Sequence, residues 1–191
     1  QDTDIYFVEH HLAHASSAYH LSGFDDASII TMDGSGEFAT TVFWEGSGGK
    51  IKKIKETSLP NSLGRFYSTV TAYLGFQAND GEYKLMGMAP YGDPSKIDLS
   101  DIIKYDKFGF ETNPEYIWVT RSRRYDINNV FSKQMVQKWG PPRSGCGLSE
   151  PYIHIAAATQ KALEDIALTL METYLGDSLK KHRTLCFAGG C

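Results

Sequence analysis

Three histidines near the start of the chain are the residue types best suited to chemistry. His10, His11 and His14 fall within five positions, and the small residues that follow them favour a helix. On a helix, His10 and His14 lie one turn apart on the same side. Two imidazoles at this spacing can bind one metal ion through nitrogen atoms about 2.0–2.1 Å away. The pair can equally be structural, because such a short pattern also arises by chance.

A carboxylate in the next segment could complete such a site. Residues 27–33 form an apolar run that predicts a strand buried on both faces, and it ends in Asp33. The carboxyl end of a strand, followed at once by a glycine turn, is a typical place for a metal or phosphate ligand. Asp33 would supply the oxygen ligand that the histidines lack. We therefore predict a metal site formed by His10, His14 and Asp33.

Two glycine-rich turns and one lysine are further candidates for ligand contact. Backbone N–H groups of Gly34, Ser35 and Gly36 could point at an anion, although most such turns are only hairpin turns. Gly189 and Gly190, after the last apolar run, permit close approach of the backbone to a ligand. Lys84 could neutralise a phosphate or a carboxylate, or could be an ordinary surface lysine.

The composition bounds the class of protein. The 191 residues can bury a core, and 41% hydrophobic with 22% charged residues is ordinary for a soluble globular protein. A net charge of −4 offers no basic surface for nucleic acid. No apolar run is long enough to cross a membrane, and no signal peptide is visible. Cys146, Cys186 and Cys191 lack metal-type spacing, which suits reduced thiols in a cytoplasmic protein.

The elements that would position these residues follow from hydrophobic periodicity and from turn residues. We predict strands at residues 4–8, 27–33, 38–44, 50–57 and 184–188, the second of which leads into a hairpin. We predict helices at residues 62–76 and 151–175, the latter ended by Gly176, besides the histidine helix. Residues 93–145, with an arginine run at 121–124, predict a small excursion from the main sheet.

Both ends of the chain indicate a fragment of a larger protein. The chain begins without Met, and it stops just after an apolar strand and a glycine turn.

Four stretches together resemble the carbamoyltransferase family that includes the nodulation-factor and antibiotic O-carbamoyltransferases. They are HHLAHA at residues 10–15, DGSGE at 33–37, GEYKLMGMAPYG at 81–92 and AGG at 188–190. They occur in the order of the family and cover most of the chain, except for about 93–140.

The resemblance implies an α/β fold that is actin-like and RNase H-like, here incomplete, with a mixed sheet flanked by helices. Residues 1–26 would end the first lobe and carry the histidine helix, and residues 27–191 would form most of the second lobe. The family also has a YrdC-like domain, which is absent from this chain.

The resemblance also implies the cofactors and the site. The metal, generally iron as Fe²⁺, would be held by His10, His14 and Asp33, and by a further aspartate beyond Cys191. On ligand chemistry alone, iron, manganese and zinc fit about equally. The turn at 34–36 and the pair Gly189–Gly190 would contact ATP or carbamoyl-adenylate, with Glu37 and Lys84 near the site.

The implied reaction passes a carbamoyl group to a hydroxyl of a small-molecule or saccharide acceptor. The YrdC-like domain would make carbamoyl-adenylate from ATP and carbamoyl phosphate, so this chain alone would be inactive. A metal could polarise the carbonyl and lower the pKa of the attacking hydroxyl. His11 is a candidate base for the acceptor, and a core histidine is its other interpretation.

Three alternatives remain open. A threonylcarbamoyl-transfer relative acting on tRNA would need a basic surface, and the net charge of −4 argues against it. An actin-like sugar or acetate kinase would use Mg²⁺ and aspartates without paired histidines. A non-catalytic metal- or nucleotide-binding module would keep the fold and lack the chemistry.

Overall fold

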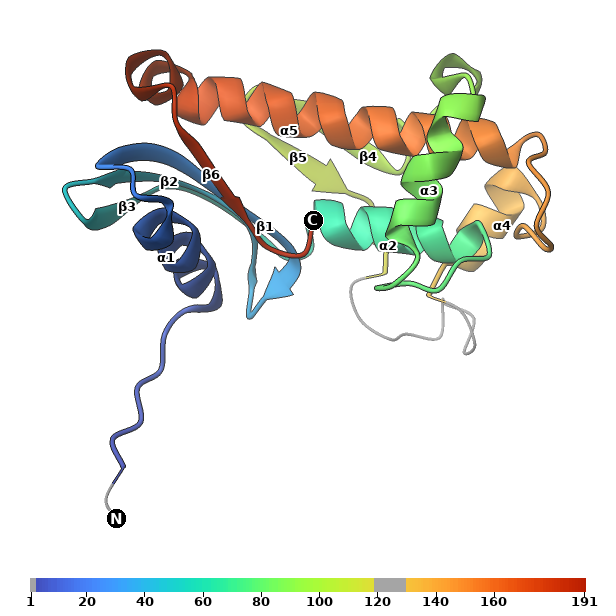
Figure 1. Cartoon of the computed structure of the whole chain (residues 1–191). Helices are drawn as coiled ribbons and strands as arrows, with labels where there is room; N and C mark the ends of the chain where they lie inside the picture. Colours follow the sequence, from blue (N-terminus) through green and yellow to red (C-terminus); the bar gives the residue numbers. More distant parts are fainter. Residues whose placement is uncertain (1–2, 119–129) are drawn as a thin grey trace.

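The chain forms a mixed four-stranded sheet with helices on both faces (Figure 1). The computed structural model describes residues 3–118 and 130–191. Strands β1 (Asp26–Gly36), β2 (Ala39–Ser47) and β3 (Lys50–Ser58) pair antiparallel, and β6 (Leu185–Ala188) pairs parallel with β1. This confirms the predicted α/β class, the hairpin and the mixed sheet. The actin-like assignment and its division into lobes stay predictions.

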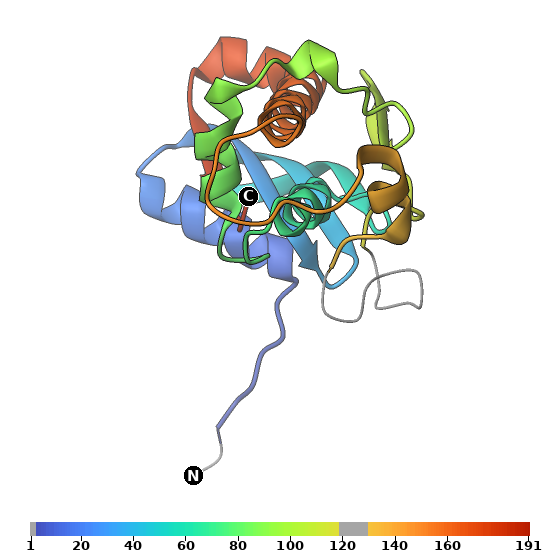
Figure 2. The same cartoon turned by 90° about the vertical axis from the view of Figure 1, so that its right-hand side faces the viewer.

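Helices cover both faces of β1, which explains its apolar sequence. On one face, Ile29 packs with Ala15 and Tyr19 of α1 (His10–Ser22). On the other face, Ile30 and Met32 join a larger core with α2 (Leu63–Tyr73) and α5 (Tyr152–His182). Figure 2 shows α5 end-on above the sheet and α1 below it.

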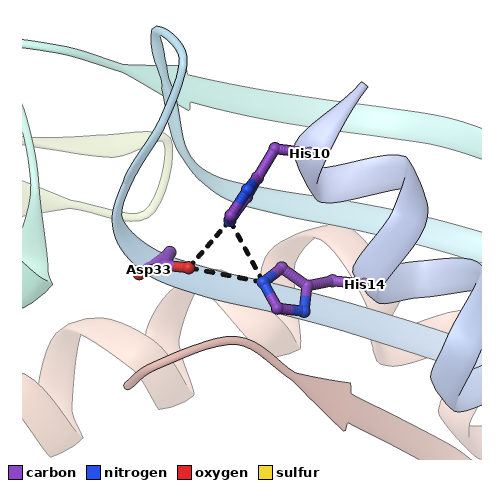
Figure 3. Close-up of side chains that lie close together, drawn as sticks. All are labelled: His10, His14 and Asp33. Carbon is purple, nitrogen blue, oxygen red and sulfur yellow. Dashed lines mark hydrogen bonds and ion pairs between the residues drawn. The ribbon is translucent and has the colours of Figure 1, made fainter. Parts of the chain in front are cut away.

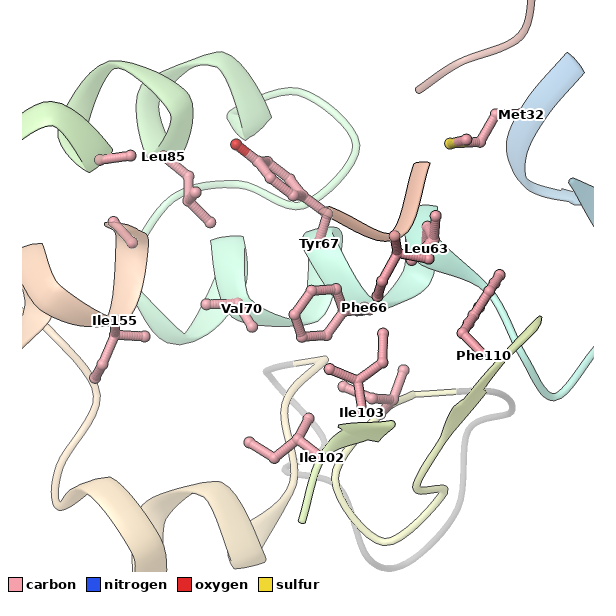
Figure 4. Packing of buried hydrophobic residues seen from close by; sticks show 14 of the residues in the cluster. Met32, Leu63, Phe66, Tyr67, Val70, Leu85, Ile102, Ile103, Phe110 and Ile155 are labelled. Carbon is pink, nitrogen blue, oxygen red and sulfur yellow. The ribbon is translucent and has the colours of Figure 1, made fainter. Parts of the chain in front are cut away.

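The larger core also holds the segment between α2 and α5. This segment comprises α3 (Glu82–Met88), two single 3₁₀ turns (Ala89–Tyr91 and Pro94–Lys96), the hairpin of β4 (Ile103–Asp106) and β5 (Gly109–Thr112), and α4 (Lys133–Trp139). Figure 4 shows Ile102, Ile103 and Phe110 packed near Phe66 of α2. The predicted excursion is thus a separate small sheet on a shared core. The arginine run at 121–124 lies outside the described residues.

The predicted strand at residues 4–8 is wrong. Residues 3–9 belong to no regular element, and Ile5, Tyr6 and Phe7 are exposed. A strand needs the hydrogen bonds of a neighbouring strand, and no described strand pairs with this segment.

Two predictions near the carboxyl end are also wrong in part. Helix α5 continues through Gly176 to His182, because Leu175 is buried and Leu179 packs on the core, which outweighs a glycine cost of about 1 kcal/mol. Strand β6 is present, but it is an edge strand with only Cys186 buried, while Leu185 and Phe187 are exposed. Within the described residues no helix is long and apolar enough to cross a bilayer.

Candidate metal centre

The structure brings His10, His14 and Asp33 together at one point (Figure 3). The Nε2 atom of His10 lies 2.9 Å from Oδ2 of Asp33, and Nε2 of His14 lies 3.4 Å from the same oxygen. The two Nε2 atoms are 3.1 Å apart. Among the described residues, this is the one group of three such side chains with ligand atoms close enough to share a metal ion.

Local structure explains this convergence. Helix α1 begins at His10, so both histidines lie in its first turns, and it packs against β1, which places them beside Asp33. The Gly34 N–H donates to Oδ1 of Asp33 at 2.7 Å, which leaves Oδ2 toward the histidines. Ser62, the N-cap of α2, donates to the Gly34 carbonyl at 2.7 Å and fixes the end of β1.

The contacts within the trio cannot all be hydrogen bonds at the same time. A neutral imidazole nitrogen carries either a proton or a lone pair in the ring plane, so Nε2 of His10 cannot donate to Asp33 and accept from His14 together. If both rings donate to Asp33, two N–H groups lie only 3.1 Å apart. A single cation among the three atoms removes this conflict, because all three then act as electron-pair donors.

The distances fit that interpretation. Two ligands about 2.1 Å from one ion, at an angle of roughly 90–110°, are about 3.0–3.4 Å apart, close to the observed 2.9, 3.1 and 3.4 Å. Burial alone would raise the pKa of Asp33, but the hydrogen bonds from His10 and Gly34 and the charges of the two imidazoles hold it below its usual value. An ionised carboxylate is the form that binds metal.

Gly36 lies against the centre rather than in an open turn. A Cβ atom added to Gly36 would stand 2.2 Å from the ring of His10. We predicted an anion contact for this glycine, and that contact stays a prediction. The structure gives a separate reason for glycine here, since any side chain would displace His10.

Of the other residues predicted to contact a ligand, some line a pocket and the rest do not. Gly34 and Gly190 line a pocket of about 530 Å³ together with Asp33. Ser35 accepts a hydrogen bond from Arg65, and Glu37 is exposed at the turn between β1 and β2. Gly189 has φ +116°, and an added Cβ would meet the Met32 carbonyl, so this glycine lets the chain close over the end of β1.

His11 lies in the core and not in the pocket. Its side chain is fully buried, with Nε2 donating to the Ala39 carbonyl at 3.1 Å and Nδ1 lying 2.9 Å from the Thr31 hydroxyl. A carbonyl only accepts, so the proton is on Nε2, and Nδ1 accepts from Thr31. Burial is the main cause that lowers the pKa of His11. The ring therefore joins α1 to the sheet and has no contact with the pocket.

The sequence analysis missed Glu82 as a residue of this pocket. Its Oε1 accepts from the Ser68 hydroxyl at 2.6 Å and from the Asn79 N–H at 2.7 Å. Within the described residues, Oε2 has no hydrogen-bond partner, and no cation lines the pocket. The acid in the Gly81–Glu82 dipeptide was the available signal, but it says nothing about which way α3 faces.

Lys84 lies elsewhere. It lines a second pocket of about 410 Å³, which shares α3 with the first but contains no residue of the trio. A groove of about 610 Å³ lies between β3 and the β4–β5 hairpin, and it too contains no residue of the trio.

Comparisons with known proteins agree with the family resemblance that the four stretches indicated. The family described as carbamoyltransferase N-terminus matches residues 1–191. An uncharacterized protein of Synechocystis is 38% identical over 96% of this chain and 30% of its own length. The nodulation protein NolNO of Sinorhizobium fredii is 33% identical over 97% of this chain and 25% of its own.

A third relative gives the same result. The nodulation protein NolO of Bradyrhizobium diazoefficiens is 31% identical over 96% of this chain and 31% of its own length. The chain thus spans less than a third of the length of these relatives. On the match over its whole length, the chain belongs to the carbamoyltransferase family, as its N-terminal region.

Proposed function

We propose that this chain is the metal- and nucleotide-binding part of an O-carbamoyltransferase. The observation that carries the proposal is the convergence of His10, His14 and Asp33 on one point, together with the pocket that Asp33 also lines. Family membership supports carbamoyl transfer as the reaction. The acceptor would be a hydroxyl of a small molecule or saccharide, and the donor would be carbamoyl-adenylate.

The trio would hold one divalent ion. When bound, the ion would supply a positive charge that stabilises negative charge on the reacting carbonyl or phosphate. Two imidazoles with one carboxylate suit iron, manganese or zinc, and the family resemblance in the sequence favours Fe²⁺. The three side chains are held in place by the protein itself. The Gly34 N–H fixes the Asp33 carboxylate, and α1 presents both histidines on one side.

The pocket suits the nucleotide. A volume of about 530 Å³ lies in the usual range of about 300–1,000 Å³ for small-molecule sites. Tyr83, Met86 and Leu163 give it apolar walls, and Gly34 and Gly190 allow a ligand close to the backbone. The open oxygen of Glu82 can accept a hydrogen bond from a ligand hydroxyl, because its other oxygen is already held by two donors.

The proposed reaction balances without a further reactant. The acceptor oxygen forms a bond to the carbamoyl carbon, and the bond from that carbon to the phosphate oxygen breaks. AMP leaves with the electron pair, and the hydroxyl proton passes to a base and then to water. The described pocket lining carries Asp33 and Glu82 and no cation, so the bound ion would have to offset the negative charge of the phosphate.

The test uses the full-length protein with ATP, carbamoyl phosphate and a panel of polyhydroxylated acceptors. We expect His14→Ala to lower the transfer of labelled carbamoyl groups at least about 100-fold, because the centre loses a ligand. Formation of carbamoyl-adenylate should continue, since it is proposed for another domain. His20→Ala, an exposed histidine on the same helix, is the control and should keep both steps. Transfer at the wild-type rate by His14→Ala would refute the proposal.

A further inference from the structure

A second pocket, on another side of α3, has no role in the proposed function. It has a volume of about 410 Å³ and is lined by α3, by Gly75 and Phe76 just after α2, and by the segment before α5. Lys84, Gly87 and Met88 line this pocket, whereas Glu82, Tyr83 and Met86 of the same helix line the pocket beside the metal centre. The two pockets are therefore chemically distinct.

Arg143 gives this pocket a buried positive charge. The residue is only 8% exposed. Its guanidinium donates to the carbonyls of Leu74 and Gly147 at 3.0–3.2 Å and lies 5.0 Å from the centre of the Phe76 ring. These contacts satisfy N–H groups but do not neutralise the charge. Among the described residues, no carboxylate forms an ion pair with Arg143.

Burying a charge is costly unless an opposite charge accompanies it. A second cation, Lys84, lines the same pocket and forms no ion pair within the described part of the chain. None of the described residues that line the pocket is acidic. The Lys84 ammonium lies 5.6 Å from the centre of the Tyr83 ring. An anion bound in the pocket would be attracted by both cations.

The other walls define the body of such a ligand. Phe76, Met88 and Leu148 are apolar, and Gly87 and Gly145 leave room because they have no side chain. We propose that this pocket binds a small organic oxyanion, a phosphate monoester or a carboxylate, with its charged group at Lys84 and Arg143 and its apolar part against Phe76 and Leu148. Binding of the oxyanion in this second pocket would be separate from carbamoyl transfer, and the proposal does not depend on the proposed function.

Cys146 provides a local readout, because this exposed cysteine also lines the pocket. The experiment measures the rate at which iodoacetamide, a neutral reagent, alkylates Cys146 in the whole chain, with each peptide followed by mass spectrometry. Phenyl phosphate is the probe, benzoate is the carboxylate counterpart and phenol is the neutral counterpart. A small free thiol in the same mixture serves as the reference for the reactivity of the reagent.

We expect phenyl phosphate, benzoate or both to slow the alkylation of Cys146 in a saturable way, and phenol to have no such effect. Lys84→Gln should weaken the protection about tenfold. Lys50→Gln removes an exposed lysine at the β2–β3 turn and should behave as the wild type. Comparing the two anions distinguishes a phosphoryl from a carboxylate ligand.

Three results would overturn the proposal. The first is that neither phenyl phosphate nor benzoate slows the alkylation of Cys146. The second is that phenol slows it equally, and the third is that the protection is unchanged in Lys84→Gln. Circular dichroism of Lys84→Gln checks that the variant is folded, and this exposed side chain is not needed by the core.

Discussion

At the scale of single residues, the centre depends on which side chains are kept out as well as on the ligands. The His10 ring occupies the space where a Gly36 side chain would lie. Gly34, two positions earlier, differs, because a Cβ atom there would meet nothing within 4 Å.

This difference yields a matched pair of variants. We expect Gly36→Ala to push the His10 ring away from Asp33 and to weaken metal binding by about tenfold or more. Gly34→Ala should leave it close to wild type. A calorimetric titration with Zn²⁺, which is redox-inert, measures both affinities. Equal affinities for the two variants would show that the contact between Gly36 and His10 does not position the ligand.

The convergence of His10, His14 and Asp33 could be predicted from the sequence, but the surroundings of these side chains could not. The four-residue spacing of His10 and His14 and the place of Asp33 at a strand end are local features, so the geometry of a helix and a strand is enough to predict them. The burial of His11 depends on Thr31 and Ala39, which lie 20 and 28 residues away. Such pairings follow from the fold, and no periodicity reports them.

At the scale of elements, a buried polar cluster joins α1 to the sheet. The Thr31 hydroxyl lies at its middle, donating to His11 and accepting from Nε1–H of Trp44 at 3.0 Å. Thr41, on the neighbouring strand, is equally buried, but its hydroxyl has no hydrogen-bond partner within the described residues.

Replacing each threonine with valine should therefore give opposite results. Thr31→Val leaves two buried polar groups unpaired, and we expect a loss of about 2–4 kcal/mol in the free energy of unfolding. Thr41→Val removes an unpaired hydroxyl, and we expect no loss or a small gain. Urea denaturation followed by tryptophan fluorescence measures both. A smaller loss for Thr31→Val than for Thr41→Val would contradict this account of the cluster.

Element boundaries were predictable where a local signal acts alone. Gly23 ends α1 with φ +77°, a left-handed conformation that glycine adopts readily at the end of a helix. Gly176 did not end α5, because long-range packing of the flanking leucines holds the helix. The strand at 4–8 failed for the opposite reason, since an apolar run without a partner strand gains no hydrogen bonds.

At the scale of the whole molecule, the chain matches the carbamoyltransferase N-terminus family over all of its residues. It spans 25–31% of the three relatives compared above. It nevertheless brings together three side chains that could bind a metal ion, from the two elements α1 and β1, and Asp33 also lines a pocket. If the ion binds the folded state and not the unfolded state, it should also stabilise the fold. Ligands that bind only the native state shift unfolding to higher temperature.

We propose that His10, His14 and Asp33 hold one metal ion. The most direct measurement is the metal content of the chain after anaerobic loading with Fe²⁺ and gel filtration, for the wild type, His14→Ala and His20→Ala. The account predicts about one iron per chain in the wild type and in His20→Ala, and a loss of most of it in His14→Ala. Equal iron in all three proteins, or none in the wild type, would contradict it.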